Sequence, residues 1–547
     1  MDIISIVRSL PMKKRSKLIA SICFGVLCLS LLVYGVVAAV QVSFGMNSSM
    51  SFTPKGVYVG ISGQTYAGEE YSNLEKLEDT AGYTYSMAEA KNFDEGDVEA
   101  GKISRNSIAD FRPDRVVLAD GGILCVEYRI QFTNYSPYQI SVIPDNKTVV
   151  NETAFHMTEV SSAILVIDPN ETAEFRINFT YFKAVTQTIR VDFELVKTAE
   201  LNKNDNYFDV SNGGIGGLTS VYQTAAPKYL YVPATIKGVT ITDYAPCSID
   251  PDTGIFSGEG AFANCVSKYV IFEKFAGATG PIFAKASVIN SAGDSETLKK
   301  ALKAADNVTS VGLTNDVTDI GTAFSYCSIR SIKMPTGVKT LSQKALAYDV
   351  YLANVDLSRT SLTSAGNDVL LGCDAIQEVV ASNNMVNNVL GTAMVQRLSF
   401  PANTTTLKTA STYLTSSTAN IKSVAIPAGV TTIPSSFVKD LKSLEYVSFG
   451  DSQVTTISSS AFANCTGLTS FTIPASVTTV GKYSFSGCTS LKLSVSDNNQ
   501  SLSTDGGNFY NKDKTKLISA EDKEVITIPN SVTEFEAGVF SDYTSLK

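Results

Sequence analysis

The chain has 547 residues, of which 44% are hydrophobic and 18% are charged, and its formal net charge is −9. A chain of this length is too long for a single hydrophobic core, so we expect at least two domains of ordered globular protein. The charge is uneven, because residues 1–17 carry +4 and the rest of the chain therefore carries −13. An acidic remainder is unsuited to gripping phosphates, so we expect no nucleic-acid partner.

The chain contains a single histidine, His156, and no recognisable motif surrounds it. Histidine is the usual general base and the commonest metal ligand in proteins, so its scarcity leaves little from which to build a catalytic or metal site. We therefore expect a protein that is not an enzyme and that needs no cofactor, with His156 in a loop or a strand.

An uncharged segment of 23 residues runs from Leu18 to Val40 and follows a basic cluster within residues 1–17. As a helix it would measure about 34 Å, enough to cross the hydrocarbon core of a bilayer. The positive-inside rule then predicts a cytoplasmic tail at residues 1–17, a single transmembrane helix at residues 18–40, and an extracellular remainder. The alternative is a signal peptide cleaved near Ala39, which would release a secreted protein. The apolar run is longer than that of a usual signal peptide, which favours the anchor.

Residues 41–200 predict a β-sandwich ectodomain. The segments 123–132, 163–167, 174–179 and 190–196 are rich in β-formers, several alternate polar and apolar residues, and turn-forming residues lie between them. Short strands of this kind are typical of an immunoglobulin-like fold. Residues 201–227 are polar and glycine-rich, which predicts a linker.

From residue 228 to residue 547 one pattern recurs, with a period of 23 residues between Leu468 and Leu491. Phe471 and Ile473 alternate in a short segment that Pro474 ends, because proline lacks the N–H that continues a ladder. The copies are degenerate before residue 300, and an insertion at about residues 495–518 interrupts them. Such a period predicts a solenoid in which the apolar positions of each repeat stack on those of its neighbours.

The repeat positions Ile473-Pro474, Val477, Val480-Gly481, Phe485, Cys488 and Leu491 resemble the BspA-type leucine-rich repeat. Residues 495–518 are similar to the non-repeat insertion seen between units of that family. The resemblance covers about residues 300–547 and implies a surface or secreted protein linked to adhesion. It implies no particular ligand, because the motif encodes the scaffold. The fold class expected for the whole chain is therefore mixed and β-rich: a transmembrane helix, an immunoglobulin-like β-sandwich and a leucine-rich-repeat solenoid with parallel strands.

Cysteine recurs at an inward position of the repeats, at Cys265, Cys327, Cys465 and Cys488. We expect buried thiols there, because a free cysteine behaves as a small hydrophobic residue. A disulfide between stacked neighbours such as Cys465 and Cys488 is the alternative.

Outward positions of the predicted repeat strands are candidates for ligand contact, since solenoids often bind through a strand face. These positions are Arg397, Ser423, Tyr446, Ser448, Ser470 and Thr472. They predict a membrane-anchored adhesin for host, matrix or envelope proteins or glycans; the alternative is a structural envelope protein that associates with itself. The last repeat carries no polar cap, so we also expect the natural chain to continue beyond Lys547 or its end to pair with another chain.

Overall fold

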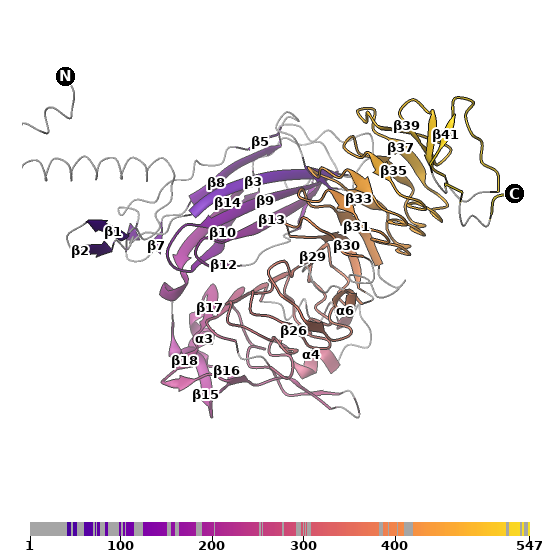
Figure 1. Ribbon diagram of the computed structural model, residues 1–547. Helices are drawn as coiled ribbons and strands as arrows, with labels where there is room; N and C mark the ends of the chain where they lie inside the picture. The colour runs from indigo at the N-terminus through magenta and orange to yellow at the C-terminus, as the bar shows by residue number, and fades with distance from the viewer. Residues whose placement is uncertain are drawn as a thin grey trace, which may run out of the picture.

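The computed structural model of the protein describes residues 41–547 with gaps (Figure 1). The longer gaps are residues 52–58, 77–82, 86–97, 114–123, 150–154, 159–163, 182–188, 291–296, 303–307, 382–386 and 410–419. The predicted cytoplasmic tail and transmembrane helix, residues 1–40, lie outside the described residues. Among the helices that are described, none is long and apolar enough to span a membrane.

Two antiparallel five-stranded sheets, together called the two-sheet unit here, make up most of the described residues before residue 198. Their orders are β11-β13-β9-β3-β4 and β12-β10-β14-β8-β5. The strands are β3 (Val59–Gly68), β4 (Glu75–Lys76), β5 (Tyr83–Tyr85), β8 (Asn106–Pro113), β9 (Leu124–Asn134), β10 (Ile140–Val149), β11 (Phe155–Thr158), β12 (Leu165–Ile167), β13 (Thr172–Tyr181) and β14 (Ile189–Lys197). Two small hairpins precede or interrupt them: β1 (Gln41–Phe44) with β2 (Ser48–Ser51), and β6 (Val98–Glu99) with β7 (Lys102–Ile103).

Side chains in β9 and β13 alternate between the two sides of their sheet. Ile130 pairs with Phe175, and both are buried together with Phe132 on one side. The four strands predicted from the sequence are confirmed as β9, β12, β13 and β14, and the unit is β-rich as expected. The immunoglobulin-like topology stays a prediction. His156 lies in β11, where it pairs with Thr180 of β13.

Residues 201–227 are folded, so the prediction of a linker there is wrong. They form η5 (Asp205–Tyr207), β15 (Phe208–Ser211), β16 (Gly214–Leu218) and α3 (Ser220–Ala225). Phe208, Ile215 and Tyr222 are buried in the same hydrophobic core as the repeats. Gly213 adopts a φ of 82° in the turn between β15 and β16, a conformation that glycine adopts without strain. The glycines therefore mark a tight hairpin at the beginning of the solenoid.

A nine-stranded parallel sheet, called the repeat sheet here, forms one wall of the solenoid, in the order β17-β23-β24-β25-β27-β29-β30-β31-β33. Its strands are β17 (Tyr229–Val232), β23 (Tyr269–Phe272), β24 (Ser310–Leu313), β25 (Ser331–Lys333), β27 (Asn354–Asp356), β29 (Glu378–Val380), β30 (Met394–Ser399), β31 (Asn420–Ala425) and β33 (Tyr446–Ser448), with β35 (Ser470–Ile473) and β37 (Lys492–Val495) beyond them. Shorter parallel strands line another side of the core: β26 (Thr340–Leu341), β28 (Ser364–Ala365), β32 (Thr432–Ile433), β34 (Thr456–Ile457) and β36 (Thr479–Val480). The prediction of a leucine-rich-repeat fold with parallel strands is confirmed.

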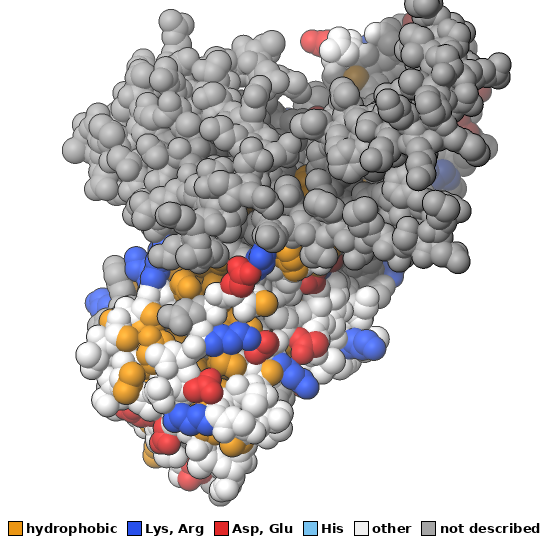
Figure 2. All heavy atoms as spheres, turned by 90° about the vertical axis from the view of Figure 1, so that its left-hand side faces the viewer, with side chains coloured by type: hydrophobic (Ala, Val, Ile, Leu, Met, Phe, Trp, Pro, Cys, Tyr) orange, Lys and Arg blue, Asp and Glu red, His pale blue; other side chains and the backbone are white. Residues whose placement is uncertain are grey.

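Short elements surround the first repeats: β18 (Thr235–Ile236), β19 (Val239–Thr240), β20 (Asp243–Tyr244), β21 (Ser248–Ile249), β22 (Phe256–Ser257), α4 (Ala286–Asn290) and, further on, α6 (Asn387–Leu390). Figure 2 shows the described part of one face, where hydrophobic side chains lie in small groups between charged ones. Ile249 and Ile255 are among the exposed apolar residues of the first repeats.

The repeats stack as the period predicts. The rings of Phe462 and Phe485 lie 5.4 Å apart and are nearly parallel, and β35 ends at Ile473, directly before Pro474. The Cys465 thiol donates to the Val438 carbonyl at 3.2 Å, which ties one repeat to the one before it. The four repeat cysteines are buried and form no disulfide with one another, so the prediction of buried thiols is confirmed.

The insertion is part of the stack. It forms an antiparallel meander of β38 (Leu502–Asp505), β39 (Asn508–Asn511) and β40 (Lys516–Ser519), and β40 then pairs in parallel with β41 (Glu534–Phe535). Asn499 fixes its beginning, because this buried side chain donates to the carbonyls of Pro474 and Val477, each at 2.8 Å. The side-chain oxygen Oδ1 of Asn499 accepts hydrogen bonds from the backbone N–H groups of Ser501 and Leu502.

Candidate binding face of the repeat sheet

The outward side of the nine-stranded sheet carries two rows of side chains, because successive residues of a strand point to opposite sides. The strand register places Ser331, Asn354, Glu378, Arg397, Ser423 and Tyr446 in one row. The second row contains Lys333, Asp356, Val380, Ser399, Ala425 and Ser448. Inward neighbours such as Val355, Val379 and Leu398 are buried in the solenoid core.

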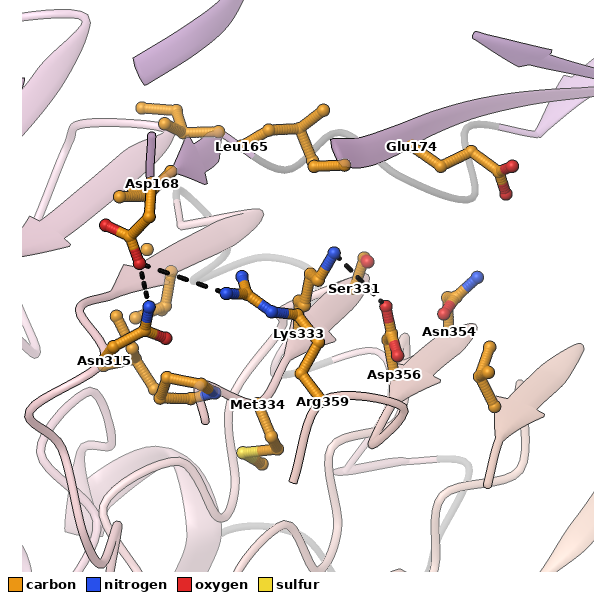
Figure 3. Close-up of a pocket in the computed structure, with 18 of the residues that line it drawn as sticks. Leu165, Asp168, Glu174, Asn315, Ser331, Lys333, Met334, Asn354, Asp356 and Arg359 are labelled. Carbon is orange, nitrogen blue, oxygen red and sulfur yellow. Dashed lines mark hydrogen bonds and ion pairs between the residues drawn. The ribbon is translucent and has the colours of Figure 1, made fainter. Parts of the chain in front are cut away.

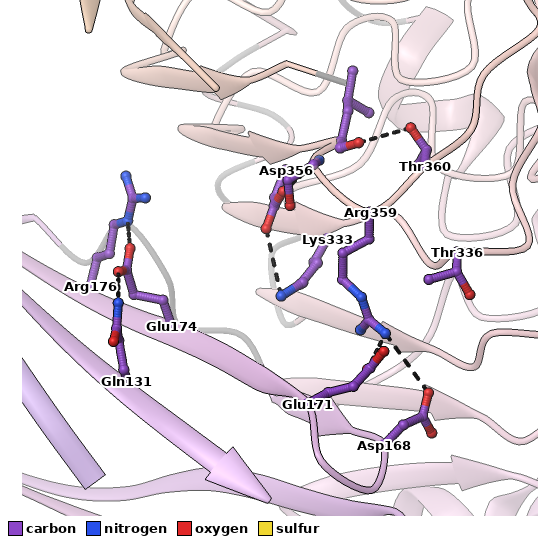
Figure 4. Close-up of polar contacts among 12 residues, drawn as sticks. Gln131, Asp168, Glu171, Glu174, Arg176, Lys333, Thr336, Asp356, Arg359 and Thr360 are labelled. Atoms are coloured by element: carbon purple, nitrogen blue, oxygen red, sulfur yellow. Dashed lines mark hydrogen bonds and ion pairs between the residues drawn. The ribbon is translucent and has the colours of Figure 1, made fainter. Parts of the chain in front are cut away.

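The two-sheet unit covers the first part of this face (Figure 1). Polar contacts come from β13 and from the turn between β12 and β13, and Figure 4 shows Asp168 and Glu171 of that turn beside Arg359. The polar contacts across the interface join Asn178 Nδ2 to Gln377 Oε1 (2.8 Å), Arg176 to Glu378, Arg359 to Glu171, Arg359 to Asp168 (3.9 Å) and Asn315 to Asp168. These contacts connect positions that are 147 to 202 residues apart in the sequence, from Asn315 with Asp168 to Glu378 with Arg176.

Where β9 and β13 face β29 and β30, six charged side chains form a cluster, called the six-charge cluster here, in which Arg129 and Glu174 are half-buried and the other four are buried. Its members are Glu127, Arg129, Glu174 and Arg176 from the two-sheet unit and Glu378 and Arg397 from the repeat sheet. Three carboxylates and three guanidinium groups balance one another, so burying the set leaves no net charge behind. The Arg129 guanidinium also lies over the Tyr66 ring, 3.9 Å from its centre.

The charges in this cluster shift one another's pKa values. Burial alone would raise the pKa of Glu127, but the positive charges of Arg129, Arg176 and Arg397 outweigh it and lower the pKa to about 2. Burial, together with the positive charge of Arg129, lowers the pKa of Arg397 to about 10. Glu127 and Arg397 are therefore both ionised at neutral pH.

The other end of the interface is apolar. Tyr231 of β17 and Tyr269 and Ile271 of β23 pack against Ile143 and Leu201 in one buried cluster. Gly312 of β24 marks the next contact, because a Cβ atom at this position would lie 3.1 Å from the Val166 side chain. The two-sheet unit thus lies close to the repeat backbone at Gly312.

Between the apolar end and the six-charge cluster lies a small cleft with about 80 Å³ of space for water (Figure 3). Ser331, Lys333, Asn354 and Asp356 form its floor, and residues of β12 and β13 form its roof. Lys333 Nζ lies 3.7 Å from Asp356 Oδ2, and Arg359 contacts acidic groups of the two-sheet unit, so these cations already have counter-charges. Space for a few water molecules is all that the closed cleft provides.

The structure separates the six predicted binding residues into different environments. Arg397 is 7% exposed and lies in the six-charge cluster rather than at the surface. Ser423 and Ser448 are buried, and Tyr446 is partly exposed. Ser470 and Thr472 of β35 are exposed, and the Thr472 hydroxyl lies 2.9 Å from that of Ser494 on β37. Their roles in binding stay predictions.

The sequence pattern did not predict the partners that bury Arg397. One signal was available, because the pattern Glu-x-Arg occurs in two predicted strands, at residues 127–129 and 174–176. A strand that places Glu and Arg two residues apart presents a stripe of opposite charges on one of its sides, and these charges can pair with one another or with another unit. Nothing local indicated that Glu378 and Gln377 would meet this stripe. Within the described residues, no group of three or more acidic, histidine or cysteine side chains could hold a metal ion.

Residues 296–413 and 408–547 match the family model described as the BspA type leucine rich repeat region, with six copies. No curated protein matches the chain significantly. Among solved structures, the pneumococcal vaccine antigen PcpA is 22% identical over 42% of this chain and 49% of its own, with a TM-score of 0.21. The chain thus spans about half the length of that antigen.

Two further bacterial structures are similar. A leucine-rich cell surface protein from Faecalibacterium prausnitzii is 15% identical over 63% of this chain and 75% of its own, with a TM-score of 0.22. The leucine-rich repeat protein of T. pallidum is 14% identical over 53% of this chain and 91% of its own, with a TM-score of 0.20. Scores this low do not establish a shared arrangement of the whole chain.

Proposed function

Because residues 296–547 match the family model of the BspA-type leucine-rich repeat region, we propose that the protein is a non-enzymatic cell-surface adhesin that binds protein or glycan ligands through its repeat strand face. The observation that carries the proposal is the exposure of Ser470 and Thr472 on β35, beyond the strands that contact the two-sheet unit. Strand faces of solenoids offer an extended surface for ligands. Hydroxyl side chains there suit hydrogen bonding to glycans or to polar protein surfaces.

Binding can be tested with the immobilised full chain against matrix proteins, mucins and cell-wall fragments. Thr472→Glu places a charge on the proposed face and should weaken binding of a captured ligand about tenfold or more, because a charge without a partner at a contact opposes binding. Thr479→Glu is the matched control, since Thr479 is an exposed threonine of the same repeat on the short strand β36. Equal binding by the two variants would remove β35 from the ligand site.

Residues 18–40 would hold the adhesin in the membrane, with residues 1–17 in the cytoplasm and the remainder outside. Support comes from the uncharged run of 23 residues and the basic cluster before it. Membrane fractionation followed by N-terminal sequencing tests this placement. A mature protein that begins near Val40 would instead establish a secreted form.

The alternative is a structural envelope protein whose repeats associate with one another. Concentration-dependent sedimentation of the full chain, with no saturable binding to any ligand of the panel, would favour that function. Saturable binding by a monomer favours the adhesin.

A further inference from the structure

The interface between the two-sheet unit and the repeat sheet has two chemically different ends. At β17 and β23 it is apolar, and this end lies beside residues 198–204, where the chain passes from one unit to the other. At β27, β29 and β30 it consists of ion pairs and side-chain hydrogen bonds, and it includes the six-charge cluster. Apolar contact at the connection and polar contact at the far end is the arrangement of a hinged cover.

Every ion of the six-charge cluster also has a partner within its own unit. Arg129 Nε lies 2.5 Å from Glu127 and Arg176 Nε lies 2.6 Å from Glu174, both within the two-sheet unit. On the repeat sheet, Arg397 Nε lies 3.8 Å from Glu378. Breaking a buried ion pair is normally costly because one charge is left without a partner. Here each unit carries equal numbers of positive and negative charges. When the two units separate, each charge therefore keeps a partner in its own unit, and all six side chains become accessible to water.

The charged groups around the cleft are partly exposed to water. Lys333 and Asp356 are paired within the repeat sheet, whereas Arg359 pairs across the interface with Asp168 and Glu171, but its side chain is 19% exposed, so water already reaches it. Polar interfaces between units of one chain separate more readily than apolar ones. Opening the polar end therefore costs little free energy. Opening the apolar end would expose Tyr231, Tyr269 and Ile271 to water, which opposes complete dissociation of the two units.

We propose that the two-sheet unit is a hinged cover over the repeat strand face, closed by an ionic latch. Opening pivots on the apolar cluster and uncovers the row from Ser331 to Arg397, which continues into the exposed face of β35. A ligand that binds only the uncovered face shifts the equilibrium toward the open form. The opening itself does not depend on the adhesin function; only its use to regulate ligand binding rests on that proposed function.

The opening can be measured without any ligand. Ser331 is buried in the closed cleft and is nearly the same size as cysteine, so Ser331→Cys reports exposure of the covered row. Labelling of the full chain with a maleimide is followed by mass spectrometry of the peptide that contains residue 331. Salt weakens the partly exposed ion pairs of the latch, those of Arg359 with Asp168 and Glu171, more than the buried ones, since the Debye length falls to about 3 Å at about 1 M salt. We expect labelling about tenfold faster at high salt than at low salt.

Two controls identify the cause. Ser470→Cys, on the exposed strand β35, should label rapidly and independently of salt, and native Cys465 should stay unlabelled, which excludes unfolding of the repeats. Arg359→Gln removes the contacts with Asp168 and Glu171 from a partly exposed position and should accelerate labelling at low salt. A labelling rate at residue 331 that neither salt nor Arg359→Gln changes would overturn the proposal. That result would leave the ligand-binding test of Thr472→Glu unaffected.

Discussion

Replacement of Phe485 by alanine should test how the repeats are held together. The side chain is 4% exposed and contacts three aromatic rings, with centroid distances of 4.8 Å to Phe471, 5.4 Å to Phe462 and 6.1 Å to Phe509. These rings belong to the same repeat, to the preceding repeat and to the insertion. Phe485 therefore joins three layers of the stack, including the insertion that the sequence left outside the pattern.

The expected cost is large. Removing a buried phenylalanine side chain costs about 3–5 kcal/mol through lost transfer energy and the cavity that remains. Three ring contacts place Phe485→Ala near the upper end of that range, since each aromatic pair adds about 0.5–1.5 kcal/mol. Phe535→Ala is the matched control, because Phe535 is 48% exposed and its described ring contact is with Phe540 at 5.8 Å. We expect about 1 kcal/mol or less there.

Hydrogen exchange followed by mass spectrometry suits this test, because a repeat array need not unfold in a single step. Phe485→Ala should lose protection in residues 462–511 and keep it in β9 and β13. Equal loss of protection in those two strands would contradict coupling between nearest neighbours. Unchanged protection in residues 462–511 would refute the assignment of Phe485 to the core.

Three other predictions follow from the buried polar groups and thiols. Asn499→Ala should destabilise the insertion by about 2–4 kcal/mol, because four backbone groups lose their hydrogen bonds. Limited proteolysis should then cleave within residues 499–520 faster than in the parent chain. Asn498→Ala is the control, because Asn498 is exposed, and it should leave the cleavage rate unchanged. Glu127→Gln should cost about 3 kcal/mol at neutral pH. Since the folded pKa of Glu127 is lowered from 4.5 to about 2, its stabilisation is complete above pH 4.5 and is lost as the pH falls toward 2. Denaturation midpoints of Glu127→Gln and the parent chain should therefore converge over that range, and a difference that persists at pH 2 would contradict the assigned ion pairs. Burial raises the pKa of Cys265 to about 11 and raises that of Cys465 as well, so a thiol reagent at pH 8 should modify neither before denaturant is added; rapid modification of the native chain would show that these thiols are accessible.

Much of the repeat fold could be predicted because its causes are local and recur. The apolar position at Phe471 and the strand end at Pro474 follow from rules that act within a few residues, and stacking repeats them along the chain. The same composition rules failed at residues 201–227. Glycines there form a hairpin turn at Gly213, and Phe208 and Tyr222 complete the core of the first repeats. The composition of a segment rich in polar residues and glycine does not indicate whether its few aromatic side chains are buried in a hydrophobic core.

The sequence by itself determined the repeat scaffold, the buried thiols and the set of outward strand positions. Only the tertiary structure decided which outward positions reach solvent. Arg397 and Ser470 are equivalent in the predicted strands, yet Arg397 is buried against charges of the two-sheet unit and Ser470 is exposed. The difference depends on contacts such as that between Asn178 and Gln377, 199 residues apart. Periodicity reports the side of a strand on which a side chain lies, whereas exposure depends on whether another unit packs against that side.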